Sequence, residues 1–138
     1  MPEKKTLEKA REDLREGRSP TTAAGEFVRE EMEHIRQGKH GARSTKQAIA
    51  IGLSKARRSG VPLKPPKKGQ TSRRTRRSAE RAYEVGQGKR KPRSPSRKRS
   101  QATSRTLRRE GRGAASKRAL SSQARRAATR RRGRRARR

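Results

Sequence analysis

Residues 44–58 read STKQAIAIGLSKARR, and this stretch indicates most clearly how the chain folds. Ser44 followed three residues later by Gln47 is the arrangement of a capping box at a helix N-terminus. Three apolar residues follow at i, i+4 and i+7 and so share one face of a helix: Ile49, Leu53 and Ala56. The stretch therefore predicts an amphipathic helix that runs to about Ser59.

Two further helix patterns precede this one. Residues 3–16 are rich in Glu, Lys, Arg, Ala and Leu, which are good helix formers. Ser19 and Pro20 then fit the N-cap and first position of a second helix, which extends to Gln37. A glycine follows the last residue of each of the three patterns and is a natural stop: Gly17, Gly38 and Gly60. Packing the apolar stripes of the second and third helices together gives a helical hairpin.

The charge of the chain is large and unevenly placed. Of 138 residues, 44 are Lys or Arg and 12 are Asp or Glu, so the net charge is +32. Residues 1–60 carry a net +5, from 14 basic and 9 acidic residues, whereas residues 61–138 carry a net +27, from 30 and 3. Most large apolar side chains lie in the first half. High charge with little apolar surface is typical of disorder.

These patterns together predict a mostly α protein with a small three-helix or hairpin head and a long disordered basic tail. We expect the helical head over residues 1–60, a Pro-rich linker over 61–71, a short helix over 72–86 and the disordered tail over 87–138. The tail is expected to be coil in isolation and partly helical when bound. The head has a core of about six large side chains, so it is marginally stable and could require a partner or a second copy.

Composition argues against an enzyme, because a catalytic site needs a rigid scaffold that excludes water. The chain has no cysteine, and Glu30 and His34 lack a third metal ligand at suitable spacing. We therefore expect no catalytic residue, no metal site and no cofactor. The N-terminus lacks the apolar region of a signal peptide, and no apolar run approaches the roughly 20 residues that span a bilayer. The expected location is the cytoplasm, in association with the nucleoid.

Repeated basic clusters indicate a nucleic-acid partner. Arginine makes bidentate hydrogen bonds with phosphate. When Lys and Arg neutralise the phosphates of a duplex, the counterions of the duplex are released, which favours binding. The chain has only one Phe and one Tyr, which disfavours stacking on single strands. The predicted contact residues outside the head are Arg73, Arg74, Arg76, Arg77, Lys89, Arg90, Lys91, Arg97, Lys98, Arg99, Arg108, Arg109, Arg125, Arg126, Arg130, Arg131, Arg132, Arg134 and Arg135. Duplex DNA is favoured over RNA as the partner.

A basic, glycine-containing segment lies directly before the helix that starts near Ser44. The N-terminus of a helix favours an anion, and cations and hydroxyl groups gather here. The candidate phosphate contacts are Lys39, His40, Arg43, Ser44, Thr45 and Lys46. An ordinary capped turn is the alternative interpretation of the same residues.

One short motif in the tail is shared with linker histones. Ser94-Pro95-Ser96-Arg97 matches their S-P-x-K/R repeat, which can place an arginine in a narrow minor groove. It occurs once, and the tail as a whole resembles linker-histone tails in composition only.

A longer resemblance covers roughly residues 11–85. It is carried by AGEFVREE at 24–31, GKHGARSTKQAIAIGLSKAR at 38–57, PPKKG at 65–69 and RRSAER at 76–81. These residues resemble a family of small basic bacterial proteins, often labelled plasmid stabilisation proteins. The resemblance implies a bacterial source and no particular chemistry, and no catalytic residue is carried over from it.

The sequence therefore predicts a non-enzymatic, largely sequence-independent DNA-binding protein that acts through phosphate contacts, like a nucleoid-associated protein. Two alternatives remain. One is a protein-interaction module in plasmid maintenance or stress response, with the head contacting a protein partner. The other is a factor associated with RNA or the ribosome.

Overall fold

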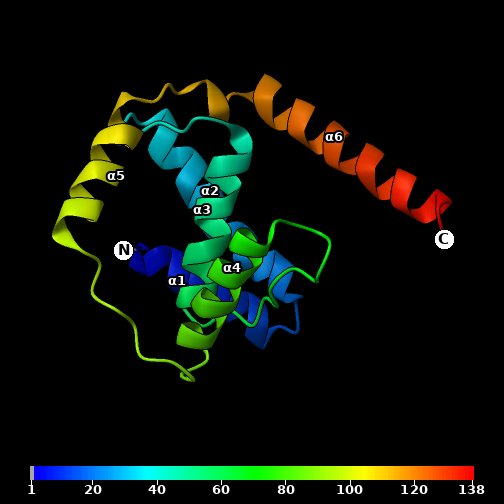
Figure 1. The fold of residues 1–138 in the computed structure, drawn as a ribbon, viewed down its shortest axis with the longest axis horizontal. Coiled ribbons are helices and arrows are strands. Elements are labelled where there is room, and N and C mark those ends of the chain that lie inside the picture. Colours follow the sequence, from blue (N-terminus) through cyan, green and yellow to red (C-terminus); the bar gives the residue numbers. More distant parts are fainter. Residues whose placement is uncertain (1) are drawn as a thin grey trace. The chain divides into compact units, whose positions relative to one another are not determined.

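The structure is a computed structural model, and it describes residues 2–138. Helices follow one another along the whole of this range (Figure 1). In chain order they are α1 (Lys4–Arg15), α2 (Pro20–Arg36), α3 (Thr45–Arg58), α4 (Arg73–Gly86), α5 (Arg97–Arg109), a 3-10 turn η1 (Gly113–Ala115) and α6 (Lys117–Ala136).

The chain divides into two compact units, and the division cuts across chain order. Unit 1 comprises Met1–Glu31 and Ile49–Ser96, and unit 2 comprises Met32–Ala48 and Arg97–Arg138. The boundaries fall within α2 and α3, so each of these helices contributes to both units. A division into an N-terminal head and a C-terminal tail does not describe this arrangement.

The first three helices begin and end within two residues of the predicted limits. Ser19 Oγ accepts the backbone N–H of Thr22, and Pro20 is the first helical residue of α2. Three glycines that follow helices adopt left-handed φ angles near 77°, 76° and 98°, as expected of helix stops: Gly17, Gly38 and Gly60. Capping chemistry in the sequence therefore located these helices correctly.

Unit 1 has a small apolar core. Phe27 is fully buried among alanines of α1, α2 and α3, and leucines pack around this cluster. Gly52 permits close approach of α3 to α2, because a Cβ there would lie 2.7 Å from the Cα atom of Val28. An ion pair between Lys55 and the buried Glu31 joins the same two helices.

Within unit 1, the end of α4 packs against the end of α3 through a glycine. A Cβ on Gly86 would lie 1.7 Å from the carbonyl oxygen of Arg57, so only glycine fits there. Arg57 itself is mostly buried, and its guanidinium donates to the carbonyl groups of Leu63 and Lys64 at 3.1 and 3.4 Å. Burial lowers the pKa of Arg57 from its usual value. These contacts fix the start of the proline-rich segment.

Unit 2 buries Met32 and Ile35, and backbone contacts join its 38–45 loop to residues 107–116. Gly41 N–H donates to the Leu107 carbonyl at 2.8 Å, and Ala42 N–H donates to the Gly111 carbonyl at 3.2 Å. A Cβ on Gly41 would lie 1.9 Å from the Glu110 carbonyl oxygen. The glycine at this position therefore serves chain packing, which the sequence did not indicate.

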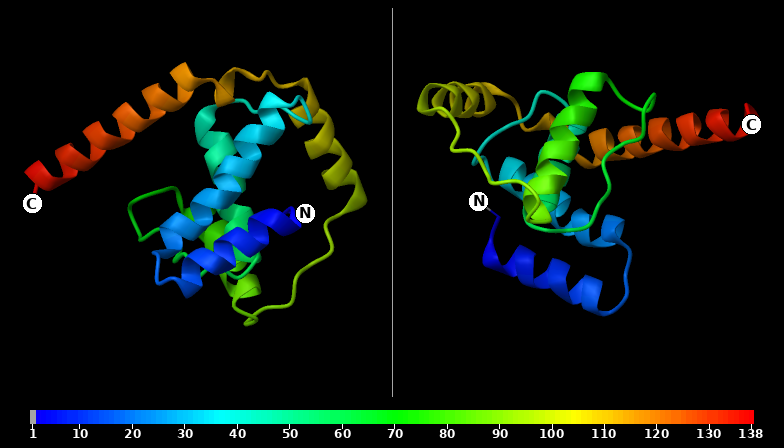
Figure 2. Two further views of the ribbon diagram at one scale, coloured as in Figure 1. Left: turned by 180° about the vertical axis from the view of Figure 1, so that it is seen from behind. Right: turned by 60° about the horizontal axis from the view of Figure 1, so that its bottom comes forward.

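The prediction of a small head with a long, intrinsically disordered tail is wrong. Within 87–138, α5 and α6 are regular helices, and Figure 2 shows α6 as one continuous helix. Neither helix has a buried residue. Arg and Ala have high helix propensity, and charges on long side chains repel weakly in water and salt. The prediction overestimated that repulsion and missed the backbone contacts that hold 107–111.

No helix within residues 2–138 is both long enough and apolar enough to cross a membrane.

Candidate nucleic-acid interface

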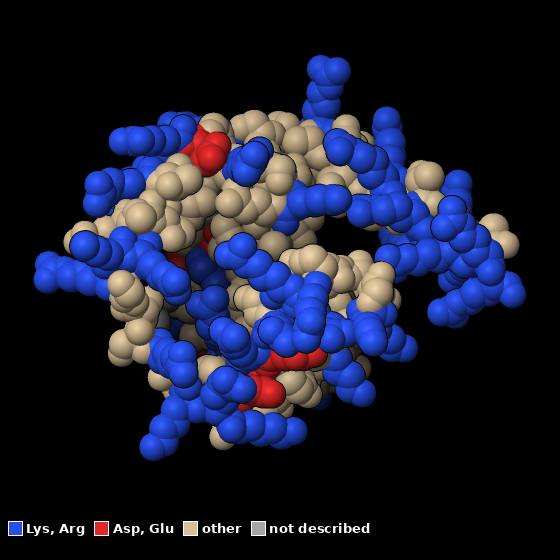
Figure 3. Space-filling model, in the orientation of Figure 1, with Lys and Arg blue, Asp and Glu red and all other residues tan. Residues whose placement is uncertain are grey.

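Unit 2 concentrates positive charge. Its 59 residues include 22 Lys and Arg but only 2 Asp and Glu, which gives a net charge of +20. Lys and Arg side chains cover much of the face seen in Figure 3, most densely over the part occupied by α6. Acidic groups form only small areas of that face. The surface of unit 2 therefore attracts anions over many residues.

The start of α3 presents unused hydrogen-bond donors. Ser44 Oγ accepts the Gln47 N–H at 3.2 Å, and Gln47 Oε1 accepts the Arg43 N–H at 2.7 Å. This is close to the predicted capping box, in which the Gln47 side chain would accept the N–H of Ser44 and not that of Arg43. The first two helical N–H groups, of Thr45 and Lys46, have no partner among residues 2–138. Ser44 also keeps its hydroxyl proton available.

Thr45 has a structural role that the sequence did not indicate. Its hydroxyl donates to the carbonyl of Ala114 at 2.6 Å, and its side chain is largely buried. Nearby, Arg36 Nε donates to the Ala115 carbonyl at 3.1 Å. These two bonds hold η1 beside the start of α3 and thereby fix where α6 begins.

The start of α6 repeats the pattern found in α3. Ser116 is the N-cap and accepts the Ala119 N–H at 3.1 Å, so its own proton remains available. The N–H groups of Lys117 and Arg118 have no partner in the described part of the chain. Both helix N-termini therefore carry a partial positive charge.

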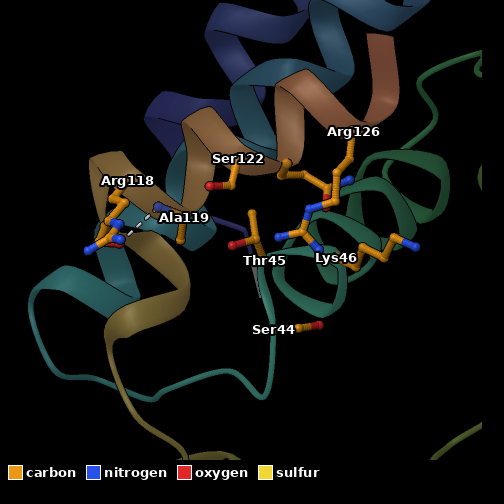
Figure 4. A pocket seen from close by; sticks show the side chains of 9 residues that line it. Ser44, Thr45, Lys46, Arg118, Ala119, Ser122 and Arg126 are labelled. Carbon is orange, nitrogen blue, oxygen red and sulfur yellow. Dashed lines mark hydrogen bonds between the residues drawn. The ribbon is translucent and has the colours of Figure 1, made fainter. Parts of the chain in front are cut away.

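A pocket of about 390 Å³ lies between these two helix starts, within unit 2. Figure 4 shows Arg126 reaching from α6 towards Thr45, with Lys46 and Arg118 on opposite sides of the view. The lining consists of Ser44, Thr45, Lys46, Ser116, Arg118, Ala119, Ser122, Gln123 and Arg126. All the charged groups in this lining are cations.

A second pocket of about 450 Å³ shares Lys46 and Arg126 with the first. Its other lining residues also lie on α6: Arg125, Thr129 and Arg130. The two pockets therefore follow one side of α6. Among residues 2–138, no Asp or Glu lines either pocket, and no ion pair involves Lys46, Arg118, Arg126 or Arg130.

The predicted contact residues are only partly brought together. Of the 38–46 segment, Ser44, Thr45 and Lys46 line the first pocket. His40 instead bonds the Gly41 carbonyl at 2.8 Å and lies edge-on to His34, with the ring centres 6.2 Å apart. The remaining two predicted residues of this segment, Lys39 and Arg43, are exposed and outside both pockets.

The basic clusters outside that segment divide between the two units. Those at 73–77 and 89–91 lie in unit 1, where Arg76 pairs with Glu80 at 3.5 Å and Arg90 pairs with Glu84 at 2.7 Å. Those at 97–99 and 108–109 lie on α5, and those at 125–135 lie on α6. Arg97 begins α5, so the Ser94–Arg97 motif leads directly into a helix.

Sequence reasoning missed the side of α6 that faces the first pocket: Ser116, Arg118, Ala119, Ser122 and Gln123. The serine at 116 is a local signal that could have located the start of this helix. The return of this helix to α3, however, depends on contacts between residues about 70 positions apart, such as Thr45 with Ala114. No local pattern signals such a pairing.

Residues 17–69 match the model of DUF6496, which is described as a family of unknown function. The match covers less than half of the chain, and the description contains no activity. No curated protein and no solved structure matches the chain.

Proposed function

We propose that the protein binds duplex DNA without catalysis and largely without regard to base sequence, mainly through phosphate contacts made by unit 2. The observation that carries this proposal is the charge of unit 2, which contains 22 basic residues and only 2 acidic ones. Affinity of this kind arises from counterion release, which reads the backbone and not the bases. A protein with this activity associates with the nucleoid.

The order of α5 and α6 supports the proposal. Cations held on a formed helix lose less conformational entropy on binding than cations on a disordered tail. The 20 residues of α6 extend about 30 Å, and its nine Lys and Arg residues point to all sides. A duplex carries one negative charge per about 1.7 Å, so a basic helix of this length lies within reach of several phosphates.

The aromatic content of the chain supports a duplex partner. The chain has one Phe and one Tyr, and Phe27 is fully buried in the core of unit 1. Proteins that bind single strands stack bases on exposed aromatic rings. Backbone contacts to a duplex need no such rings.

The test is a fluorescence anisotropy titration of the full chain with two duplex DNAs of unrelated sequence and with a duplex RNA. We expect the two DNAs to bind alike, and affinity to fall by about 10³-fold or more between about 50 and 200 mM salt. Tighter binding to the RNA would favour the RNA-associated alternative. Equal affinity at both salt concentrations would contradict the proposal.

A further inference from the structure

We infer that the two pockets along α6 form one groove that holds a strand of phosphodiester backbone, so the arginines of α6 are not equivalent. This inference rests on the proposed function, that the protein binds duplex DNA. It adds a defined place of contact to what is otherwise a diffuse attraction.

The groove is continuous because the two pockets share Lys46 and Arg126. Along α6 it runs from Ser116 to Arg130, which at 1.5 Å per residue is a length of about 21 Å. Its lining residues recur every three or four positions, which is the spacing of one helix face: Ala119, Ser122, Arg126 and Thr129. A groove of this length accommodates several consecutive phosphates.

Its donors suit phosphate oxygens. The free hydroxyl protons of Ser44 and Ser116 and the unpartnered N–H groups at the starts of α3 and α6 lie at one end. Two helix N-termini and the guanidinium of Arg126 line that same end. Backbone N–H groups at a helix start bind phosphate well, because they point outward and carry the positive end of the dipole.

The positive charge of the groove favours a bound anion. Cations line both pockets, and within residues 2–138 no carboxylate balances them there. These cations are exposed, so they are available to contact phosphate oxygens. A bound phosphate strand neutralises them and releases its own counterions. Arg131 and Arg135 lie on the opposite side of α6 and outside both pockets, so they lack this interaction.

Two adjacent serines give a matched test. Ser122 lines the groove, whereas Ser121 lies on another side of the same helix and is exposed. Ser122→Glu and Ser121→Glu change the net charge equally and have the same helix propensity. We expect Ser122→Glu to weaken binding of the full chain to duplex DNA by about tenfold or more, because a carboxylate then faces the bound phosphates. Ser121→Glu should weaken it by about twofold.

A second pair of variants removes charge without adding any. Arg126→Gln with Arg130→Gln takes two charges from the groove, and Arg131→Gln with Arg135→Gln takes two from the opposite side. Gln keeps helix propensity, which circular dichroism verifies. The groove pair should reduce the log–log salt slope by about 1.8, at about 0.9 per phosphate contact, and the other pair by less than about 1.

Failure of the inference and failure of the proposed function give different results. If the unaltered chain binds duplex DNA and both members of each matched pair lose affinity equally, the groove is refuted while diffuse binding stands. If the unaltered chain binds no duplex DNA, the proposed function is refuted and the groove with it.

Discussion

Units 1 and 2 carry the same number of basic residues but different numbers of acidic residues. Each has 22 Lys and Arg, but unit 1 has 10 Asp and Glu and unit 2 has 2, for net charges of +12 and +20. Unit 1 buries Phe27 in an apolar cluster, whereas α5 and α6 of unit 2 bury no residue. The number of cations alone therefore does not identify a binding surface. The number of acidic residues is what distinguishes the two units.

The two units also differ in what holds them together. In unit 1, side chains of α1, α2 and α3 bury apolar area. Unit 2 also buries apolar side chains, such as Met32 and Ile35, but in addition backbone hydrogen bonds join its 38–45 loop to residues 107–111. Gly41 allows the close approach that these bonds require. Truncation of Phe27 should therefore act on unit 1, and a Cβ added at the close backbone contact of Gly41 should act on unit 2.

The largest effect on stability should come from Phe27→Ala. Removing a fully buried phenyl ring leaves a cavity and costs about 3–5 kcal/mol, which is a large part of the stability of so small a core. Urea unfolding with hydrogen exchange at α1 and α3 measures this loss. Leu120→Ala on α6 is the control and should cost less than about 1 kcal/mol. Similar losses for both variants would mean that unit 1 has no core of the kind described.

Gly41→Ala should have the next largest effect, on unit 2. Its Cβ would meet the Glu110 carbonyl oxygen at 1.9 Å, so the loop must separate from 107–111 at a cost of about 2–3 kcal/mol. Faster amide exchange at Ala42 reports the change. Gly111→Ala is the matched control, because nothing lies within 4 Å of its Cβ. Protection of Ala42 that survives Gly41→Ala would contradict the proposed role of this contact.

A smaller effect distinguishes two helical glycines of unit 1. Gly52→Ala places a Cβ 2.7 Å from the Val28 Cα atom and should cost about 1–2 kcal/mol, after the gain in helix propensity. Gly25→Ala meets no atom within 4 Å and should stabilise α2 by about 0.5–1 kcal/mol. Opposite shifts of the urea midpoint are expected. Shifts of the same sign would contradict the close packing of α2 on α3.

The smallest effect concerns the hydroxyl of Thr45. Thr45→Val removes its hydrogen bond to the Ala114 carbonyl and should destabilise unit 2 by about 1 kcal/mol. Thr106→Val is the control, since that hydroxyl bonds only a carbonyl of its own exposed helix at 3.0 Å. Exchange rates of amides in η1 and at the start of α6 compare the two variants. Equal rates would leave Thr45 without a role in positioning α6.

The sequence predicted those parts of the fold that depend on local chemistry. The N-caps at Ser19 and Ser44 and the stop at Gly17 each depend on a few adjacent residues, and each is present. The segments of α5 and α6 were predicted to be coil because of their high net charge. They are helices because the helix propensity of Arg and Ala outweighs the repulsion between their charges. The net charge of a segment therefore does not by itself show whether the segment is helical, because the helix propensity of its residues also counts.

The α3 side of the candidate site could be predicted in the same way. Ser44 and Lys46 were expected near a phosphate because they start a helix, and they line the first pocket. The α6 side, including Arg118 and Ser122, lies about 70 residues later in the chain. Its position depends on pairings such as Gly41 with Leu107, and a sequence pattern carries no information about a pairing of that range.

The most direct measurement compares the salt dependence of duplex binding for two charge-matched variants of the full chain. One replaces three exposed arginines of unit 1 by Gln: Arg73, Arg74 and Arg77. The other replaces three arginines that line the groove of unit 2: Arg118, Arg126 and Arg130. We predict that the log–log slope becomes less steep by about 2.7 for the unit 2 variant and by less than about 1 for the unit 1 variant. Equal changes in slope, or a slope near zero for the unaltered chain, would contradict the assignment of phosphate binding to unit 2.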